Sequence, residues 1–310
     1  MRTTTFGKTN LQVTRVSMGC NRLGDPGTSV EQWYPLVEQA LNAGVTLFDT
    51  SQSYNQGRSE EILGTVTSTW ARPIAIATKV GVPILTDDFP NRSFRAAEIL
   101  RDVEGSLRRL RREAIDLYQL HSPTVTQLEE QDWALAFDRL KRDGKVLHTG
   151  ISTSDHASGI WAIRHGIEFL QVEYSLLDPT AEDELFPLAI REHVGIMVRQ
   201  PLARGLLSGK FRAGEPIPPD QQWRRPRGKQ LELRLRRVAQ LHFLIRPGQT
   251  LAQAAIRFVL RHPAVHSVIP GARTSQQLAD NLGADRGDLT EEEYCQIRTI
   301  IDQWRREEEW

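Results

Sequence analysis

Apolar positions along the chain fall into short β-rich runs separated by longer stretches with helical spacing. Eight short runs predict buried strands, at residues 16–18, 45–48, 74–77, 115–118, 146–147, 169–172, 196–198 and 265–269. The intervening stretches predict helices, at 31–43, from 59, and at 93–110, 127–142, 155–165, 183–192, 250–261 and 275–281. Because parallel neighbours need a crossover, this alternation predicts a parallel sheet. Eight strands is the number that closes a (β/α)8 TIM barrel.

Two segments do not follow this repeat. The first 15 residues place two short apolar runs around Gly7-Lys8-Thr9-Asn10 and predict an N-terminal β-hairpin ahead of the barrel. Residues about 203–247 form a long Pro- and Arg-rich loop after strand 7. A loop of that length in a compact domain is functional or has helices of its own. No linker interrupts the chain, so we expect a single domain over residues 1–310.

Composition excludes several classes of protein. The chain has 310 residues, 39% of them hydrophobic and 25% charged, which is typical of a globular protein. The 39 basic and 39 acidic residues balance, which argues against nucleic acid or an anionic membrane as a partner. Two cysteines without zinc spacing, and no long apolar run, predict a cytoplasmic protein with no metal and no membrane contact.

Polar residues end three successive predicted strands. Asp49 ends the second, Lys79 the third and His121 the fourth, and Tyr54 follows five residues after Asp49. In a barrel these strand ends surround one mouth, where active sites lie. A single Asp or Lys at such a place is more often a turn or solvated residue. Three consecutive strand ends favour an active site instead.

Three stretches around these residues resemble the aldo-keto reductase superfamily. They are the run FDTSQSYNQGRSEEILG at 48–64, Leu-His-Ser-Pro at 120–123 and Ile-Pro-Gly-Ala-Arg at 269–273. The resemblance extends from residue 6 to about residue 284. It points to a bacterial-type branch related to the potassium-channel β-subunit-like reductases. It implies a barrel that reduces an aldehyde or ketone to an alcohol with NAD(P)H, with Asp49, Tyr54, Lys79 and His121 as a catalytic tetrad.

The tetrad's residue types suit this chemistry. Hydride transfer leaves negative charge on the carbonyl oxygen, which Tyr54 would protonate. A nearby Lys79 ammonium favours the tyrosinate and lowers the pKa of Tyr54. Asp49 would hold Lys79 charged and oriented, and His121 would hydrogen-bond the substrate oxygen.

The resemblance also implies a set of cofactor-binding residues. Near the strand ends these are Cys20, Asn21, Asp49, Ser152, Thr153 and Gln171, of which Ser152 and Gln171 would hold the nicotinamide carboxamide. After strand 7 they are Arg199, which would stack on the nicotinamide, and Pro201, Leu202, Ala203 and Lys210, which would follow the pyrophosphate. After strand 8 they are Gly271, Arg273, Gln277 and Asn281, which would bind the adenosine end.

Some of these assignments have alternatives. Lys210 is equally interpreted as a solvated loop lysine, and Arg273 as a surface cation near a helix start. Thr153 stands where many members have Asn. Gly271 stands where many NADP-preferring members have Lys. NADP is therefore the expected cofactor, with NAD possible.

The loops at the mouth would bind a small-molecule carbonyl substrate. Residues 82–95 would form one wall, and Arg22, Leu23 and Asp25 another. Two rival functions use the same barrel. One is a redox-neutral epimerase, lyase or dehydratase that retains its nicotinamide cofactor, and the other is a cofactor-sensing regulatory subunit. The sequence does not define the natural substrate, the direction of the reaction or the oligomeric state.

Overall fold

The structure is a computed structural model, and it describes residues 1–84, 91–212, 214–215, 217 and 226–307. Its main sheet has eight parallel strands in the order β10-β9-β8-β7-β6-β5-β4-β3. They are β3 (Met18–Gly19), β4 (Leu47–Asp49), β5 (Ala75–Val80), β6 (Ile115–His121), β7 (Val146–Thr153), β8 (Phe169–Glu173), β9 (Gly195–Arg199) and β10 (Ser267–Val268). Parallel bridges Val16–Val268 and Gly19–Gly271 join the first strand to the last. The predicted (β/α)8 barrel and its eight strands are confirmed.

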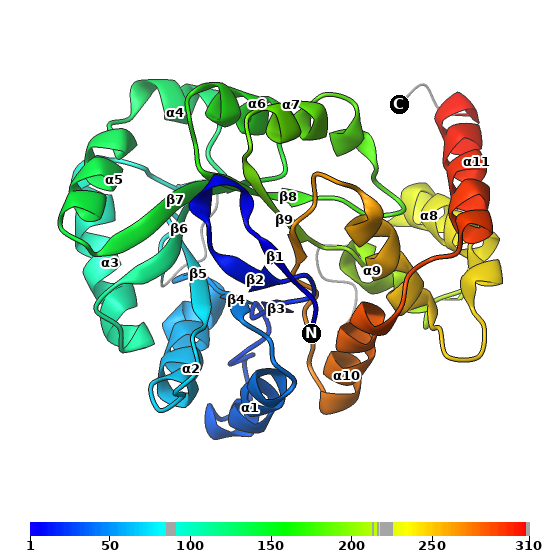
Figure 1. Cartoon of the computed structure of the whole chain (residues 1–310), viewed down its shortest axis with the longest axis horizontal. Coiled ribbons are helices and arrows are strands. Elements are labelled where there is room, and N and C mark those ends of the chain that lie inside the picture. The colour runs from blue at the N-terminus through cyan, green and yellow to red at the C-terminus, as the bar shows by residue number, and fades with distance from the viewer. Residues whose placement is uncertain (85–90, 213, 216, 218–225, 308–310) are drawn as a thin grey trace.

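Helices surround the barrel on the outside (Figure 1). They are α1 (Tyr34–Asn42), α2 (Arg58–Thr67), α3 (Ala96–Leu110), α4 (Val125–Glu130), α5 (Trp133–Arg142), α6 (His156–Arg164), α7 (Leu185–Arg191), α9 (Leu251–Arg261) and α10 (Ser275–Gly283). Local sequence fixes their ends. Thr250 begins α9 with a capping box, in which its hydroxyl accepts from the Gln253 N–H. Gly44, with φ of 89°, allows the chain to leave α1 in the left-handed region.

The single helix predicted over 127–142 is wrong, because the chain forms α4 and α5 there. Gln131 is extended, with φ of −102° and ψ of 148°. Its side-chain oxygen accepts from the Phe94 N–H at 2.6 Å, and Asp132 accepts from the Ala96 N–H at 2.7 Å. These two side chains satisfy free N–H groups at the start of α3, and this tertiary requirement outweighs the helical spacing.

The long loop after strand 7 has helices of its own, as one interpretation predicted. These are the 3-10 helix η5 (Ala203–Ser208), α8 (Gly228–Gln240) and the 3-10 helix η7 (His242–Leu244). Beside α8 lies the C-terminal helix α11 (Glu291–Glu307), on one side of the barrel (Figure 1). The Trp304 indole donates to the Gln240 side chain at 2.6 Å and joins the two helices.

The predicted N-terminal hairpin is present and closes one end of the barrel. Strand β1 (Thr3–Thr5) pairs antiparallel with β2 (Gln12–Thr14), and Figure 1 shows the pair lying across the barrel. Phe6, fully buried, packs on Phe169 with ring centroids 5.7 Å apart. One apolar cluster joins the hairpin to the barrel interior, and it contains Phe6, Val13, Leu47, Ala75, Ala77, Leu117, Phe169, Met197 and Ile269. The opposite end of the barrel therefore forms the mouth.

Candidate active site

Inside the barrel, an apolar layer of side chains is followed by a polar layer, which lies closer to the carboxyl ends of the strands. Side chains on a strand alternate between faces, so a residue two positions after an inward apolar residue also points inward. These second positions are polar on four strands, and they are Asp49 after Leu47, Lys79 after Ala77, Gln119 after Leu117 and Gln171 after Phe169. All four are buried. The polar layer thus lies directly on the apolar cluster.

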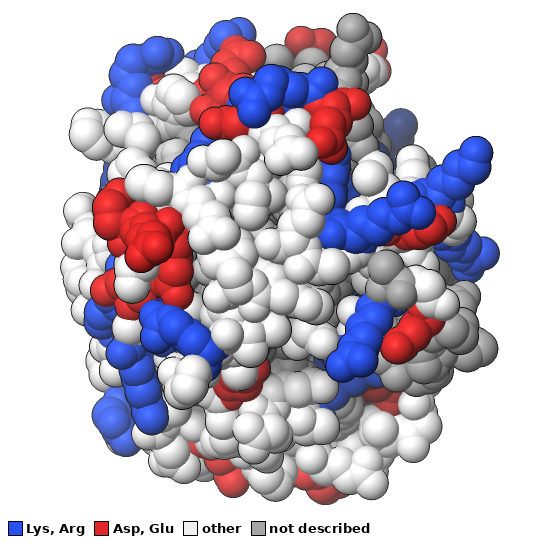
Figure 2. Space-filling model, turned by 90° about the vertical axis from the view of Figure 1, so that its right-hand side faces the viewer, with Lys and Arg blue, Asp and Glu red and all other residues white. Residues whose placement is uncertain are grey.

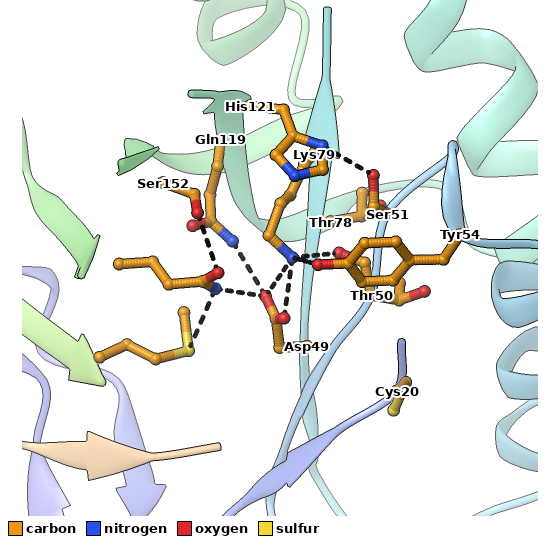
Figure 3. A network of polar contacts seen from close by, with 12 residues as sticks. Cys20, Asp49, Thr50, Ser51, Tyr54, Thr78, Lys79, Gln119, His121 and Ser152 are labelled. Carbon is orange, nitrogen blue, oxygen red and sulfur yellow. Dashed lines mark hydrogen bonds and ion pairs between the residues drawn. The ribbon is translucent and has the colours of Figure 1, made fainter. Parts of the chain in front are cut away.

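Lys79 is the centre of this layer (Figure 3). Its ammonium donates to both carboxylate oxygens of Asp49 at 2.8 Å and to the backbone oxygen of Thr50 at 2.7 Å. It also lies 3.2 Å from the hydroxyl of Tyr54. The structure therefore brings three of the four tetrad residues into direct contact.

Burial and charge act in opposite directions on Tyr54 and Lys79. Burial raises the pKa of Tyr54, and the neighbouring Lys79 ammonium only partly offsets this effect. Lys79 acts in the expected direction, but the net shift of the Tyr54 pKa is upward. For Lys79, burial lowers the pKa, but Asp49 and Tyr54 together outweigh burial, and the net shift of the Lys79 pKa is upward. At neutral pH the phenol is therefore protonated and the ammonium charged.

His121 also lies beside Tyr54. Its ring meets the Tyr54 ring edge to face, with centroids 5.9 Å apart. Its Nδ1 lies 3.3 Å from the hydroxyl of Ser51. Tyr54 itself begins a strained turn, because Asn55 and Gln56 have positive φ of 51° and 59°. The four tetrad residues thus form one cluster at the mouth.

The two residues expected at the nicotinamide carboxamide belong to the same network. Ser152 donates to the side-chain oxygen of Gln171 at 2.9 Å, and the amide of Gln171 donates to Asp49 at 2.6 Å. Thr153 lies next to this pair but bonds locally, since its hydroxyl accepts from the Asp155 N–H at 2.9 Å before α6. A chain of polar contacts therefore runs from Ser152 to Tyr54.

Arg199 ends β9 and is held by an acid that sequence reasoning missed. Its guanidinium lies 2.7 Å from Glu173, which is two residues after Gln171 on β8. The two-residue spacing, which puts Glu173 on the same face of β8 as Gln171, was the sequence signal that could have identified it. The Nε of Arg199 is buried and has no hydrogen-bond partner among the described residues. The backbone that follows is strained, with φ of 57° at Gln200 and 47° at Ala203.

The segment expected at the pyrophosphate follows directly. Pro201 and Ala203 are buried, and Leu202 is half-buried. Lys210 lies beyond η5 and is exposed, with its ammonium 4.8 Å from the centroid of the Phe211 ring. The structure thus leaves Lys210 outside the buried polar network.

The residues expected at the adenosine end form a second cluster. Gln277 accepts from the Arg273 N–H at 2.9 Å, and Asn281 donates to the Gly271 oxygen at 3.2 Å. The Arg273 side chain approaches Asp25, with 3.5 Å from Nε to the carboxylate. Arg22 lies 2.6 Å from the same oxygen. Arg22 and Asp25, expected in a substrate wall, therefore connect to the adenosine segment.

Cys20 and Asn21 lie where β3 ends. Cys20 is fully buried, and burial raises the pKa of its thiol well above the ordinary value. A Cβ added to Gly271 would lie 3.0 Å from the side-chain oxygen of Asn21. A larger residue at position 271 would therefore require the Asn21 side chain to shift.

Parts of the first expected substrate wall and of the long loop after strand 7 lie outside the described residues. In the loop over 82–95 these are residues 85–90, and in the excursion over 203–247 they are 213, 216 and 218–225. The described start of the first loop is anchored, because Gln52 donates to the Val82 oxygen and to Asp102, each at 3.1 Å. The roles of both loops stay predictions.

The surface shown in Figure 2 is the side of the barrel with α8, α9 and α11. Among the described residues on this face, Lys and Arg lie interspersed with Asp and Glu around an uncharged centre, so these residues create no field of one sign. Within the described ranges, no helix has the length and apolar character needed to span a membrane. The described His, Cys, Asp and Glu residues include no group of three or more that could hold a metal ion.

Comparison with known proteins gives a consistent result. The sequence pattern of the aldo/keto reductase family matches residues 15–302. An uncharacterized oxidoreductase of Bacillus subtilis, YqkF, is 30% identical, with 94% of each chain covered. A probable voltage-gated potassium channel subunit beta of Oryza sativa is 28% identical, with 90% of this chain and 89% of the relative covered. The holo form of aldo-keto reductase AKR11C1 from Bacillus halodurans superposes with a TM-score of 0.81 at 30% identity, covering 97% and 96% of the two chains.

Proposed function

The chain belongs to the aldo/keto reductase family of oxidoreductases, and we propose that it reduces an aldehyde or ketone to an alcohol with NADPH, with Tyr54 as proton donor. One observation carries this proposal, which is the contact of the buried Lys79 ammonium with both Asp49 and Tyr54. A buried phenol beside an ammonium at the mouth of a barrel is suited to giving up a proton and stabilising the anion that remains.

The chemistry divides among the chain's own residues. When bound, the reduced nicotinamide supplies the hydride that the carbonyl carbon accepts. Tyr54 then gives its proton to the carbonyl oxygen, and Lys79 stabilises the tyrosinate. Asp49 keeps Lys79 charged and in place. His121, beside the Tyr54 ring, orients the substrate oxygen.

The residues at the mouth fit a nicotinamide dinucleotide. Ser152 and Gln171 offer a hydroxyl and an amide, which complement a carboxamide. Arg199 has a buried Nε without a partner among the described residues, and its planar guanidinium can stack on a flat ring. Arg273 precedes α10, whose free N–H groups and positive dipole end favour an anion. The position of Arg273 at the start of α10 favours NADPH, with its 2′-phosphate, over NADH.

A regulatory subunit is a second candidate, favoured by the channel-subunit relative. Such a protein would bind the cofactor and turn over slowly or not at all. We place either function in the cytoplasm, where the free Cys20 and Cys295 would stay reduced.

A panel of aldehydes and ketones, followed by NADPH absorbance, tests the proposal. We expect consumption of NADPH that depends on the carbonyl substrate. Binding of NADPH without consumption would favour the regulatory subunit. Conversion of a substrate without net consumption would favour a redox-neutral epimerase, lyase or dehydratase.

A further inference from the structure

A second amide besides Gln171 reaches the carboxylate of Asp49. Gln119 lies on β6 two residues before His121, so both side chains point into the barrel. The Gln119 amide donates to Asp49 Oδ1 at 3.2 Å (Figure 3). The residue is fully buried, and its carbonyl oxygen Oε1 has no hydrogen-bond partner among the described residues.

Packing does not explain an amide at this position. A buried carbonyl oxygen without a partner destabilises the folded state, and few native polar groups are left in this condition. An apolar side chain of the same length would fill the space without this cost. The inward residue one layer below, Leu117, is apolar. What the amide provides is one N–H directed at Asp49.

The hydrogen bonds around Asp49 are unequal on its two oxygens. Oδ1 accepts from Lys79 at 2.8 Å, from Gln171 at 2.6 Å and from Gln119 at 3.2 Å. For Oδ2 the described contact is Lys79, at 2.8 Å. The two amides therefore neutralise part of the Asp49 charge. Lys79, whose remaining N–H groups face Thr50 and Tyr54, keeps more of its positive charge available to Tyr54.

We propose that Gln119 is a positioning residue, which acts on Tyr54 through Asp49 and Lys79 and favours formation of the tyrosinate. Among the residues that the structure describes, the other titratable or charged groups that face Tyr54 are His121 from β6 and Arg199 from β9. This inference rests on the proposed role of Tyr54 as the proton donor.

Gln119→Met tests the inference, because it keeps the side-chain length and removes the N–H. Without that donor, the Asp49 carboxylate offsets more of the positive charge of Lys79. The tyrosinate is then less stabilised by Lys79, and the pKa of Tyr54 rises. Alcohol oxidation needs the tyrosinate, so its rate should rise with pH at a higher pH than in the wild type, by about half a unit or more. The melting temperature should stay equal or increase, since the unpartnered oxygen is gone. Gln119→Leu serves if the Met variant does not fold.

Gln52→Met is the matched control. It removes a buried amide close to the mouth that bonds to Val82 and Asp102 rather than to Asp49. We expect a lower melting temperature and an unchanged pH profile. A lower melting temperature for Gln119→Met, with the profile also unchanged, would show a packing role and overturn the inference.

A second measurement separates this inference from the proposed function. Tyrosinate absorbance is titrated in each protein with and without Tyr54→Phe, and the difference reports Tyr54 without turnover. A shift to higher pH in Gln119→Met supports the inference even if no carbonyl substrate is consumed. An unchanged difference titration overturns it, whether or not the wild type is an active reductase.

Discussion

At the residue scale, the function depends on one phenol in a buried, charged surrounding. Burial raises the pKa of Tyr54, so the phenol keeps its proton until hydride transfer makes the substrate oxygen a stronger base. The Lys79 ammonium, 3.2 Å away, stabilises the anion once the proton has left. The same pair thus suits proton donation in reduction at neutral pH and proton acceptance in oxidation at higher pH.

Replacement of Tyr54 by Phe removes the donor and leaves the ring. We expect kcat for carbonyl reduction to fall by about 10²–10⁴-fold, the usual contribution of a positioned acid. The Kd for NADPH, measured by fluorescence titration, should stay unchanged. Tyr34→Phe is the control, because Tyr34 begins α1 outside the tetrad cluster. Turnover by Tyr54→Phe close to that of the wild type would contradict the role of Tyr54.

At the element scale, ion pairs connect the start of α10 to the loop after β3. Asp25 lies within ion-pair distance of Arg22 and of Arg273. A 2′-phosphate bound at α10 would compete with Asp25 for Arg273. The same arginine would therefore contribute to the choice between NADPH and NADH.

Replacement of Arg273 by Leu should weaken NADPH binding by about 10–100-fold, the range of a charge-assisted hydrogen bond. The Kd for NADH should change little, because NADH lacks the phosphate. Asp25→Asn should tighten NADPH binding, since it frees Arg273. Arg286→Leu is the control, as Arg286 is an exposed arginine after α10. An equal loss of affinity for both cofactors in Arg273→Leu would exclude a specific phosphate contact.

Elements also show what the sequence could predict. The eight strands follow from short apolar runs, because most of their residues are buried on both faces of the barrel; Leu147 in β7 is an exception, since it is exposed. The break between α4 and α5 did not follow, since it depends on side chains of Gln131 and Asp132 that bind α3, far away in the chain. For the site, strand ends revealed Asp49, Lys79 and His121. Gln119 and Glu173 were missed because only the inward alternation along β6 and β8 marks them.

At the scale of the whole molecule, the two ends of the barrel have separate tasks. The hairpin and Phe6 close one end with apolar packing, and the polar layer lies at the other. A buried charged cluster is costly, so the remaining barrel has to supply the stability that the site does not. Part of this stability comes from ion pairs that lie away from the mouth.

Glu168, just before β8, is one such group. It accepts from Thr149 N–H at 2.9 Å and lies 2.8 Å from Lys141 and 2.9 Å from His148, and so ties α5 and β7 to β8. Burial opposes its charge, but the contacts with His148, Lys141 and Thr149 prevail and lower its pKa from 4.5 to about 2. Because the folded state holds the proton less tightly than the unfolded state, this stability is complete above about pH 4.5. It disappears as the pH falls toward 2.

Glu168→Gln should therefore lower the free energy of unfolding by about 1–3 kcal/mol at pH 7, and by less at each step below pH 4.5. Urea unfolding at several pH values measures this difference. Glu184→Gln is the matched control, because Glu184 pairs with Arg164 where both side chains are more than 60% exposed, and such pairs contribute little. A deficit of the same size at pH 7 and at about pH 3 would mean that Glu168 stabilises the barrel by packing rather than by its charge.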